Sequence, residues 1–295
     1  MANTSHCLAP AAWYTFTNGT IQKTPESEVL YRSSRRDVVL LGEHHDDADH
    51  HLWQLQVLAA LHMLRPDMVI GFEAFPRRVQ PVLNQWSAGQ LTQSQFLERV
   101  EWQKIWNVPA TLYLPLFEFA RLNRIPMAAL NVDRALTAEI SRNGWDAVPQ
   151  ERREGVSRAA PVLRPYEDSL LDAFTQHSKD KRAPSRGDPA FRRFVEAQTT
   201  WDRAMAEAIA SRLGASGGSR PLVVAIMGSG HVEHGHGVTH QLRDLGIGNT
   251  ATLLPLESST PCAEIEPDLA DAVFALPGDR RDKPASPVAA PTEMR

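Results

Sequence analysis

The sequence predicts an α/β protein with a largely parallel central sheet flanked by helices, with one helical insertion. Three short apolar runs support the sheet, at 38–41, 68–72 and 222–227. None of them alternates apolar with polar residues, which is typical of parallel strands covered on both faces. Segments with a helical spacing of apolar residues lie between the runs, as expected for βαβ units.

The first βαβ unit spans residues 37–75. Its helix is predicted over 47–64 and is closed by Pro66. Because such crossovers are nearly always right-handed, we expect the two strands of this unit to lie side by side. The first strand breaks into Glu43 and the second ends in Glu73. Ligands of open α/β sheets bind at the carboxyl edge, so both carboxylates are expected at a binding edge.

The remaining elements follow in order. Residues 1–36 are predicted to be a lead-in with an extended piece and a short helix. Further helices are predicted within 77–107 and at 114–123, 135–142, 191–213 and 239–245, and further strands at 127–130, 222–227 and 251–256. The last of these strands is expected to complete the sheet. The main domain is therefore predicted to cover residues 37–256.

Two segments depart from this pattern. Residues 146–190 contain many prolines and basic residues and few apolar ones, which indicates a mobile helical insertion that forms a lid over the sheet edge. The tail, 257–295, becomes rich in Pro, Ala and charge from about residue 277 and is expected to be partly disordered.

Composition excludes several classes of protein. The chain has 295 residues, 42% of them hydrophobic, and a formal charge of −4, so neither nucleic acid nor a membrane surface is an expected partner. No apolar run approaches the ~20 residues of a spanning helix. The start of the sequence shows no export signal, so we expect a cytoplasmic location. Cys7 and Cys262 lie at opposite ends of the chain, and no disulfide framework is expected.

Histidines mark the candidate site, because nine of the 11 fall within 44–62 and 231–240. Each cluster begins just after a predicted strand. Two histidines and a carboxylate form the His₂Glu type of metal centre, which leaves one position open for water. His45 and His231 are the first choices, since each lies three residues after a glycine that ends a strand.

Glu73 and Glu43 are the candidate carboxylates. One would be a metal ligand and the other a general base or a group that orients a ligand. The predicted catalytic set is therefore Glu43, His45, Glu73 and His231, with His45, Glu73 and His231 as ligands of a divalent metal ion. The alternative is that these groups only hydrogen-bond one another and the loop backbone.

Other polar residues are predicted to line the same site. His51 lies on the inward face near the start of its helix. Gln198, Trp201 and Asp202 interrupt the inward face of the helix at 191–213, and buried polar groups need partners that a site wall would supply. Asp202 is equally compatible with a bridge between helices. His62 is expected to have a core or surface role, and His50, His234, His236 and His240 are expected to be solvated.

Five segments resemble one known family, namely 38–56, 71–75, 129–131, 198–206 and 228–237. They look like segments of the ChaN-type haem-binding proteins of the Tiki/TraB/erythromycin-esterase superfamily, and they occur in the same order as in that family. The likeness covers roughly residues 37–256. The two G-x-x-H elements of the family fall on 42–45 and 228–231.

The resemblance implies two kinds of activity. ChaN-like proteins are linked to haem and iron uptake and hold haem between protomers through a tyrosine, which implies a homodimer. More distant relatives are metal-dependent proteases or esterases that use the G-x-x-H histidines and a glutamate matching Glu73. The chain departs from the uptake pattern in lacking a visible export signal and lipidated cysteine. We therefore expect a haem- or iron-handling protein, with a metal-dependent hydrolase as the alternative.

Tyr166 is the candidate haem ligand, matched to the family by approximate location only. A phenolate can hold ferric haem, and four arginines of the insertion could attract the propionates: Arg152, Arg153, Arg158 and Arg164. The alternative is that Tyr166 only packs beside Leu170 and Leu171. Tyr113 is the rival ligand, nearer the core helices.

Overall fold

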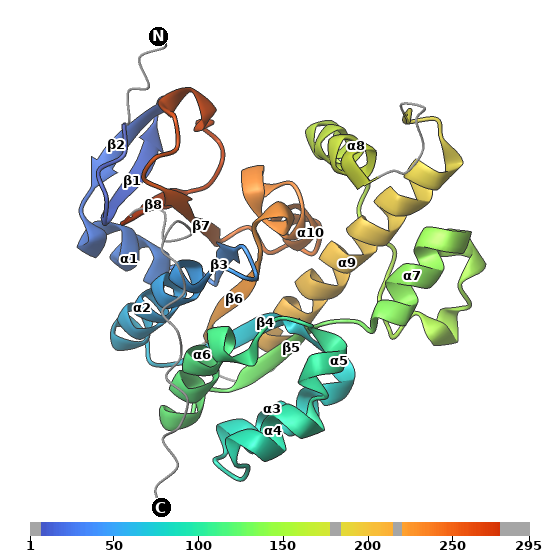
Figure 1. Ribbon diagram of the computed structural model, residues 1–295, viewed down its shortest axis with the longest axis horizontal. Coiled ribbons are helices and arrows are strands. Elements are labelled where there is room, and N and C mark those ends of the chain that lie inside the picture. The colour runs from blue at the N-terminus through green and yellow to red at the C-terminus, as the bar shows by residue number, and fades with distance from the viewer. Residues whose placement is uncertain (1–6, 178–183, 215–219, 278–295) are drawn as a thin grey trace, which may run out of the picture.

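An eight-stranded sheet organises the computed structural model, which describes residues 7–177, 184–214 and 220–277 (Figure 1). The strand order is β2-β1-β8-β7-β3-β6-β4-β5. The strands are β1 (Ala12–Thr17), β2 (Thr20–Thr24), β3 (Val38–Glu43), β4 (Met68–Pro76), β5 (Met127–Asn131), β6 (Leu222–Gly228), β7 (Thr250–Glu257) and β8 (Ala272–Leu276). From β8 to β5 all pairings are parallel, while β1 is antiparallel to both of its neighbours. The predicted α/β class and largely parallel sheet are confirmed.

Helices cover both faces of this sheet. They are α1 (Glu26–Ser34), α2 (Ala48–Leu64), α3 (Gln80–Ser87), α4 (Gln93–Arg99), α5 (Trp102–Ile105), α6 (Ala110–Leu122), α7 (Arg134–Asn143), α8 (Arg164–His177), α9 (Pro189–Gly214) and α10 (Val238–Asp244). Within the described residues, no helix combines the length and the apolar character needed to cross a membrane.

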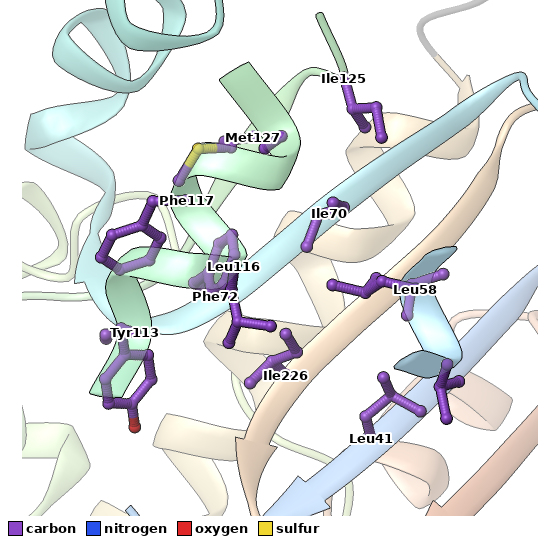
Figure 2. Packing of buried hydrophobic residues seen from close by; sticks show 14 of the residues in the cluster. Leu41, Leu58, Ile70, Phe72, Tyr113, Leu116, Phe117, Ile125, Met127 and Ile226 are labelled. Atoms are coloured by element: carbon purple, nitrogen blue, oxygen red, sulfur yellow. The ribbon is translucent and has the colours of Figure 1, made fainter. Parts of the chain in front are cut away.

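Alternate residues of the central strands build two cores. Leu41 faces α2 and α6 and packs in one cluster with Leu58 and Phe117, as Figure 2 shows. Its neighbour Leu40 faces the opposite side and packs with Met205 of α9. Both faces are buried, which explains why these strands read as continuous apolar runs.

The strand order corrects one prediction. β3 and β4 do not lie side by side, because β6 lies between them and pairs with both. All seven residues of β6 are buried, so the centre of the sheet suits this strand better than an edge would. The predicted proximity of the two histidine clusters follows from the same order, since β3 and β6 are neighbours and Glu43 pairs with Gly228.

The strand at 250–257 does not complete the sheet, contrary to expectation. β8 pairs with β7, and β1 and β2 extend the same edge. These strands come from residues 12–24 and 272–276, outside the range predicted for the main domain. The run Ala272–Leu276 is apolar, and pairing with two strands buries most of it. The predicted disorder from about residue 277 falls almost entirely on 278–295, which lie outside the described residues.

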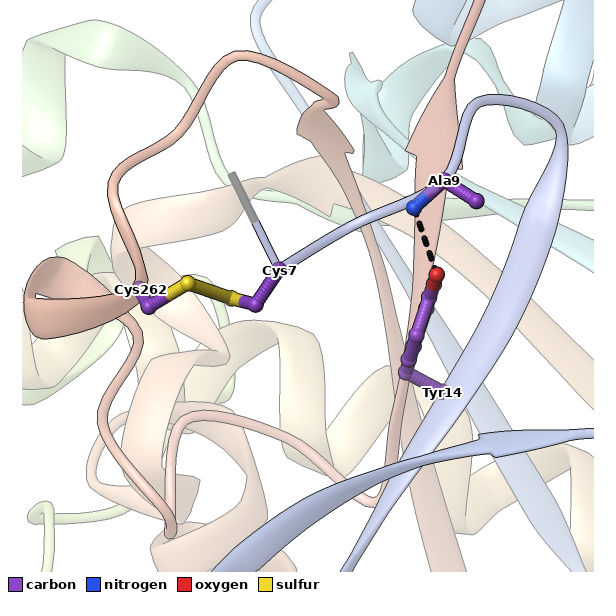
Figure 3. The surroundings of a disulfide bond; sticks show 4 residues. All are labelled: Cys7, Ala9, Tyr14 and Cys262. Carbon is purple, nitrogen blue, oxygen red and sulfur yellow. Dashed lines mark hydrogen bonds between the residues drawn. A yellow bond between two sulfur atoms is a disulfide. The ribbon is translucent and has the colours of Figure 1, made fainter. Parts of the chain in front are cut away.

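The expectation of no disulfide was wrong. Cys7 and Cys262 are bonded, with their Cα atoms 5.5 Å apart despite a separation of 255 residues (Figure 3). The antiparallel pairing of β1 with β8 brings the start of the chain to the loop after β7, and the backbone N–H of Ala9 donates to the Tyr14 hydroxyl at 2.6 Å beside it. Disulfides are typical of oxidising compartments. The cytoplasmic location, which rested partly on their absence, stays a prediction.

Candidate functional site

The ends of β3 and β6 and the second half of β4 bring the candidate carboxylates together, since β4 continues to Pro76 and does not end at Glu73 as predicted. Glu43 is the last residue of β3, and its register partner Gly228 is the last residue of β6. Glu73 lies in β4, where the pairing with β5 becomes irregular. Its Oε2 atom accepts the backbone N–H of Gly228 at 2.7 Å. The bond from Gly228 thus fixes one oxygen of a buried carboxylate at the carboxyl edge of the sheet.

His231 lies between two buried carboxylates. Its Nδ1 atom is 2.6 Å from Oδ1 of Asp202, and its Nε2 atom is 3.5 Å from Oε1 of Glu73. Burial by itself would lower the pKa of His231, but the charges of Glu73 and Asp202 outweigh burial and raise the pKa to about 9. The imidazole is therefore protonated at neutral pH in this arrangement.

Glu73 has one oxygen with no hydrogen bond. Oε1 is buried and has no hydrogen-bond partner, whereas Oε2 holds the Gly228 N–H. The nearest group to Oε1 is Nε2 of His231, which lies at ion-pair distance but too far for a good hydrogen bond. Oε1 is available to accept a proton or a ligand.

His45 repeats the arrangement of His231 on the other side of Glu73. Its Nδ1 atom lies 2.8 Å from Oε1 of Glu43. A Cβ atom placed on Gly228 would lie 3.2 Å from Nε2 of His45 and 3.7 Å from Oε2 of Glu73. Both side chains therefore approach the glycine that ends β6, and any larger residue there would push against them.

Glu43 is held from several sides. It accepts hydrogen bonds from the Tyr113 hydroxyl and, at 2.9 Å, from Nε2 of Gln54. Burial raises the pKa of Glu43, but the bond from His45 and the neighbouring His51 reverse the effect and leave the pKa lowered. For His45, burial lowers the pKa, and the bond to Glu43 and the charge of Glu73 raise it above its ordinary value.

His51 points inward, as the sequence indicates. Its Nε2 atom lies 3.0 Å from the carbonyl oxygen of His45, and its Nδ1 atom lies 3.1 Å from Oε1 of Gln54. His51 therefore positions the loop that carries His45. The spacing of His51 and Gln54, one helical turn apart, was the signal that could have revealed Gln54.

Trp201 and Gln198 line a groove of about 390 Å³ beside α7 and α9. The Trp201 ring lies 5.1 Å from the His231 ring. Nε1 of Trp201 and Oε1 of Gln198 are buried without a hydrogen-bond partner. Trp201 thus lies next to His231, whereas the place of Gln198 in the site stays a prediction.

Tyr166 packs beside Leu170, as the alternative reading predicts, while its role as a haem ligand stays a prediction. Its hydroxyl donates to Oδ2 of Asp202 at 3.1 Å, and the same carboxylate contacts His231 through Oδ1. Its ring packs with Leu170 and Phe191. Burial, followed by the charge of Asp202, raises its pKa well above the ordinary value. The start of the insertion's helix therefore covers the sheet edge. The mobility of the lid stays a prediction, and residues 178–183 lie outside the described part of the chain.

The four arginines of the insertion already have partners. Arg152 pairs with Glu139 and Arg158 with Asp146. Arg164 lies 3.5 Å from Glu167, and the Arg153 guanidinium lies over the Trp145 ring. A propionate would have to compete with these contacts.

His50 corrects the expectation of a solvated histidine. It is 4% exposed, and its Nδ1 atom accepts the backbone N–H of His44 at 2.9 Å. Burial lowers its pKa to about 4. The helix start turns His50 toward the end of β7, a contact that helical periodicity does not reveal.

A pocket of about 500 Å³ adjoins this cluster. Six of its lining residues are apolar, three are basic and two are acidic. The apolar ones are Ala74, Pro76, Ile105, Trp106, Val132 and Ala135, the basic ones are Arg78, Lys104 and Arg134, and the acidic ones are Glu101 and Asp133. The Trp106 ring meets the His45 ring edge-on at 4.7 Å. Arg78 and Lys104 pair with acids, whereas Arg134 forms no ion pair among the described residues.

His45, Glu73 and His231, the predicted metal ligands, are not among the groups of described residues whose ligand atoms all lie within 4.8 Å of one another. Among the described residues, two other groups have ligand atoms that all lie within 4.8 Å of one another: Asp47, His50 and Glu257, and His234, Glu266 and Asp268. The donor types of His45, Glu73 and His231 suit a divalent metal ion, but their atoms would have to approach one another. This metal centre stays a prediction.

Two solved structures are similar in fold to this chain. No curated protein matches its sequence. The ChaN structure of Campylobacter jejuni, described as showing cofacial haem binding, aligns with 89% of this chain and 96% of its own, with a TM-score of 0.68 and 18% identity. An erythromycin esterase mutant in its open conformation aligns with 82% of this chain and 76% of its own, with a TM-score of 0.50 and 12% identity. Both likenesses concern the fold.

The sequence itself also matches a family model. The model describes haem-binding uptake proteins of the Tiki superfamily, ChaN, and it covers residues 29–242. This range contains every residue of the candidate site, and the predicted resemblance is confirmed. The chain belongs to the ChaN family of haem-binding uptake proteins in the Tiki superfamily.

Proposed function

We propose that this protein binds haem at the carboxyl edge of the sheet, in the pocket beside Trp106, with His45 as the ligand of the iron. Membership of a haem-binding family supports haem as the ligand. The pocket supports the location, because it offers an apolar wall for a porphyrin and the unpaired guanidinium of Arg134 for a propionate.

The hydrogen bonding and exposure of the His45 imidazole are the main support for its role as the iron ligand. Its Nδ1 atom is fixed by Glu43, and its Nε2 atom forms no hydrogen bond within the described residues. Its side chain is 38% exposed, and its ring packs on Trp106, which lines the pocket. An imidazole with one nitrogen held by a carboxylate and the other unoccupied is the arrangement that metal-ligating histidines adopt.

Tyr166, the ligand that the sequence predicts, is the alternative to His45. Ligation through its oxygen would require the hydroxyl to leave Asp202 and the buried phenol to lose its proton. The raised pKa of Tyr166 opposes that loss. The other residues predicted to bind the cofactor, His51, Gln198, Trp201 and Asp202, act in this proposal through the positions of His45 and His231. A homodimer that shares haem stays part of the prediction.

A haemin titration tests the proposal. The purified protein is titrated with haemin while the Soret band is followed, and His45→Ala is compared with His44→Ala, its exposed neighbour in the same loop. We expect His45→Ala to weaken binding at least tenfold and His44→Ala to match the parent protein. Equal affinity of the His45→Ala variant would rule out His45 as the iron ligand.

A second function, hydrolysis, is supported by Oε1 of Glu73, which has no hydrogen bond within the described residues and lies 3.5 Å from Nε2 of His231. Oε1 could take a proton from a water molecule that attacks an ester or amide carbonyl, while the imidazolium of His231 donates a proton to the leaving group. Asp202 would hold the imidazole in position. The metal-dependent form of this proposal assigns His45, Glu73 and His231 as ligands.

Hydrolysis is tested with a panel of aryl esters and dipeptides, with chelator and with added Zn²⁺. Glu73→Gln keeps the shape of the side chain and should abolish any turnover. Turnover that survives in Glu73→Gln, or its absence in the parent protein under all conditions, would exclude this second function.

A further inference from the structure

We propose that His234, Glu266 and Asp268 form a surface site for a divalent transition-metal ion such as Zn²⁺. The site lies outside the cluster around Glu73 and does not depend on haem binding. It uses the part of the histidine-rich segment 231–240 that the functional site leaves unused.

Two separate loops supply the three side chains of the site. His234 lies in the turn after β6, whereas Glu266 and Asp268 lie in the connection between β7 and β8. The backbone N–H of His234 donates to the carbonyl oxygen of Leu269 at 2.9 Å, which joins the two loops. One ligand atom from each of the three side chains lies within 4.8 Å of the other two.

The tautomer of His234 points to a cation. Its Nδ1 atom is 3.2 Å from Oδ1 of Asp268, so a neutral imidazole places its proton on Nδ1. The lone pair of Nε2 then faces Oε2 of Glu266 at 3.9 Å. Two acceptors that face each other repel unless a positive charge lies between them.

The distances suit a metal ion in that position. Zinc bonds to imidazole nitrogen and carboxylate oxygen are each about 2.0–2.2 Å long, so the two donor atoms lie about 3.4–4.2 Å apart for tetrahedral to linear angles. The 3.9 Å between His234 and Glu266 falls in this range. Asp268 orients the imidazole as carboxylates do in many zinc sites.

The carboxylates of the site have no ion pair with Lys or Arg among the described residues, although the guanidinium of Arg243 lies near Gly235 in the same turn. Within the same residues, His234 is the only ion-pair partner of Glu266 and of Asp268. The His236 ring stacks on His234 with its centroid 5.3 Å away, which offers a second imidazole near the same point. A divalent cation would neutralise both carboxylates.

The second group of neighbouring ligand atoms differs from this site in the tautomer of its histidine. In the cluster of Asp47, His50 and Glu257, Nδ1 of His50 accepts the backbone N–H of His44. The proton of the neutral imidazole must then lie on Nε2, so no lone pair faces the carboxylates. This group is therefore not assigned a metal.

The test compares zinc stoichiometry between variants of the full chain. Protein freed of metal with a chelator is titrated with ZnCl₂ by calorimetry. The double variant Glu266→Gln, Asp268→Asn changes exposed side chains, at 69% and 73% exposure, so the fold is preserved. His234→Asn is the second variant, because the residue has φ 56° and asparagine tolerates the left-handed region. His240→Ala is the control, since its ring contacts the carbonyl oxygen of Pro161 instead.

We expect both variants to bind one zinc ion fewer than the parent protein and His240→Ala to bind the same number. Zinc should also raise the melting temperature of the parent protein more than that of the double variant. If His234 is instead an imidazolium that bonds both carboxylates, the parent protein and the variants will bind zinc equally or not at all, and either result overturns the proposal.

Discussion

The Nε2 atom of His231 and the Oε1 atom of Glu73 face each other at 3.5 Å, and Oε1 has no hydrogen-bond partner within the described residues. The pair joins the end of β6 to β4 at the carboxyl edge of the sheet. Because Asp202 holds the other side of the imidazole, the charge of His231 depends on two buried carboxylates.

Stability should depend on pH through His231. The folded protein raises the pKa of this imidazole from 6.5 to about 9, so the protonated form stabilises the fold. This contribution is fully present below the ordinary pKa and is lost as the pH rises through the raised one. We expect the free energy of unfolding to fall by up to about 3 kcal/mol across this range. Urea denaturation of metal-free protein at several pH values measures it, and His231→Gln should flatten the curve.

Glu73→Gln should shift the titration of His231. The charge of Glu73 is the largest cause that raises this pKa, and the amide removes the charge while keeping the shape. We expect the pKa of His231 to move down from about 9, observed in the imidazole resonances by NMR. An unchanged titration curve would show that Glu73 and His231 do not interact as the geometry requires.

Tyr166→Phe should leave haemin binding unchanged if His45 is the iron ligand. The variant keeps the ring in its cluster with Leu170 and Phe191 and removes only the oxygen that donates to Asp202. A stability loss of about 1 kcal/mol is expected from the missing hydrogen bond. A changed Soret spectrum with a preserved fold would instead support Tyr166 as the ligand.

Loss of the disulfide should destabilise the fold without disturbing the site. The bond closes a separation of 255 residues and fastens the chain start to the loop after β7. Cys7→Ser should lower the free energy of unfolding by about 2–5 kcal/mol. Reductant should produce the same loss in the parent protein and no further loss in the variant. Equal melting temperatures with and without reductant would contradict the bond.

Strand ends and helix faces were readable from the sequence because they rest on local signals. The apolar run of β3 ends in Glu43, and Asp202 interrupts the inward face of α9. Their convergence follows from the rule that parallel strands share a carboxyl edge. His45 and His231 were identified by their spacing from glycines that end strands.

The strand order and the partners of these groups could not be read in the same way. The insertion of β6 between β3 and β4 depends on packing of the whole sheet. The bond from Tyr113 to Glu43 joins residues 70 positions apart, and the bond from Cys7 to Cys262 depends on β1 pairing with β8. No local pattern carries such contacts.

The proposed iron ligand can be measured directly by electron spin echo envelope modulation of the ferric haem complex. Protein carrying ¹⁵N-labelled histidine is compared with unlabelled protein, so that the porphyrin nitrogens stay the same in both. If His45 binds the iron, labelling will change the nitrogen modulation, and the change will disappear in His45→Ala and persist in His44→Ala. A modulation pattern that labelling leaves unaltered would contradict ligation by histidine and with it the proposed haem site.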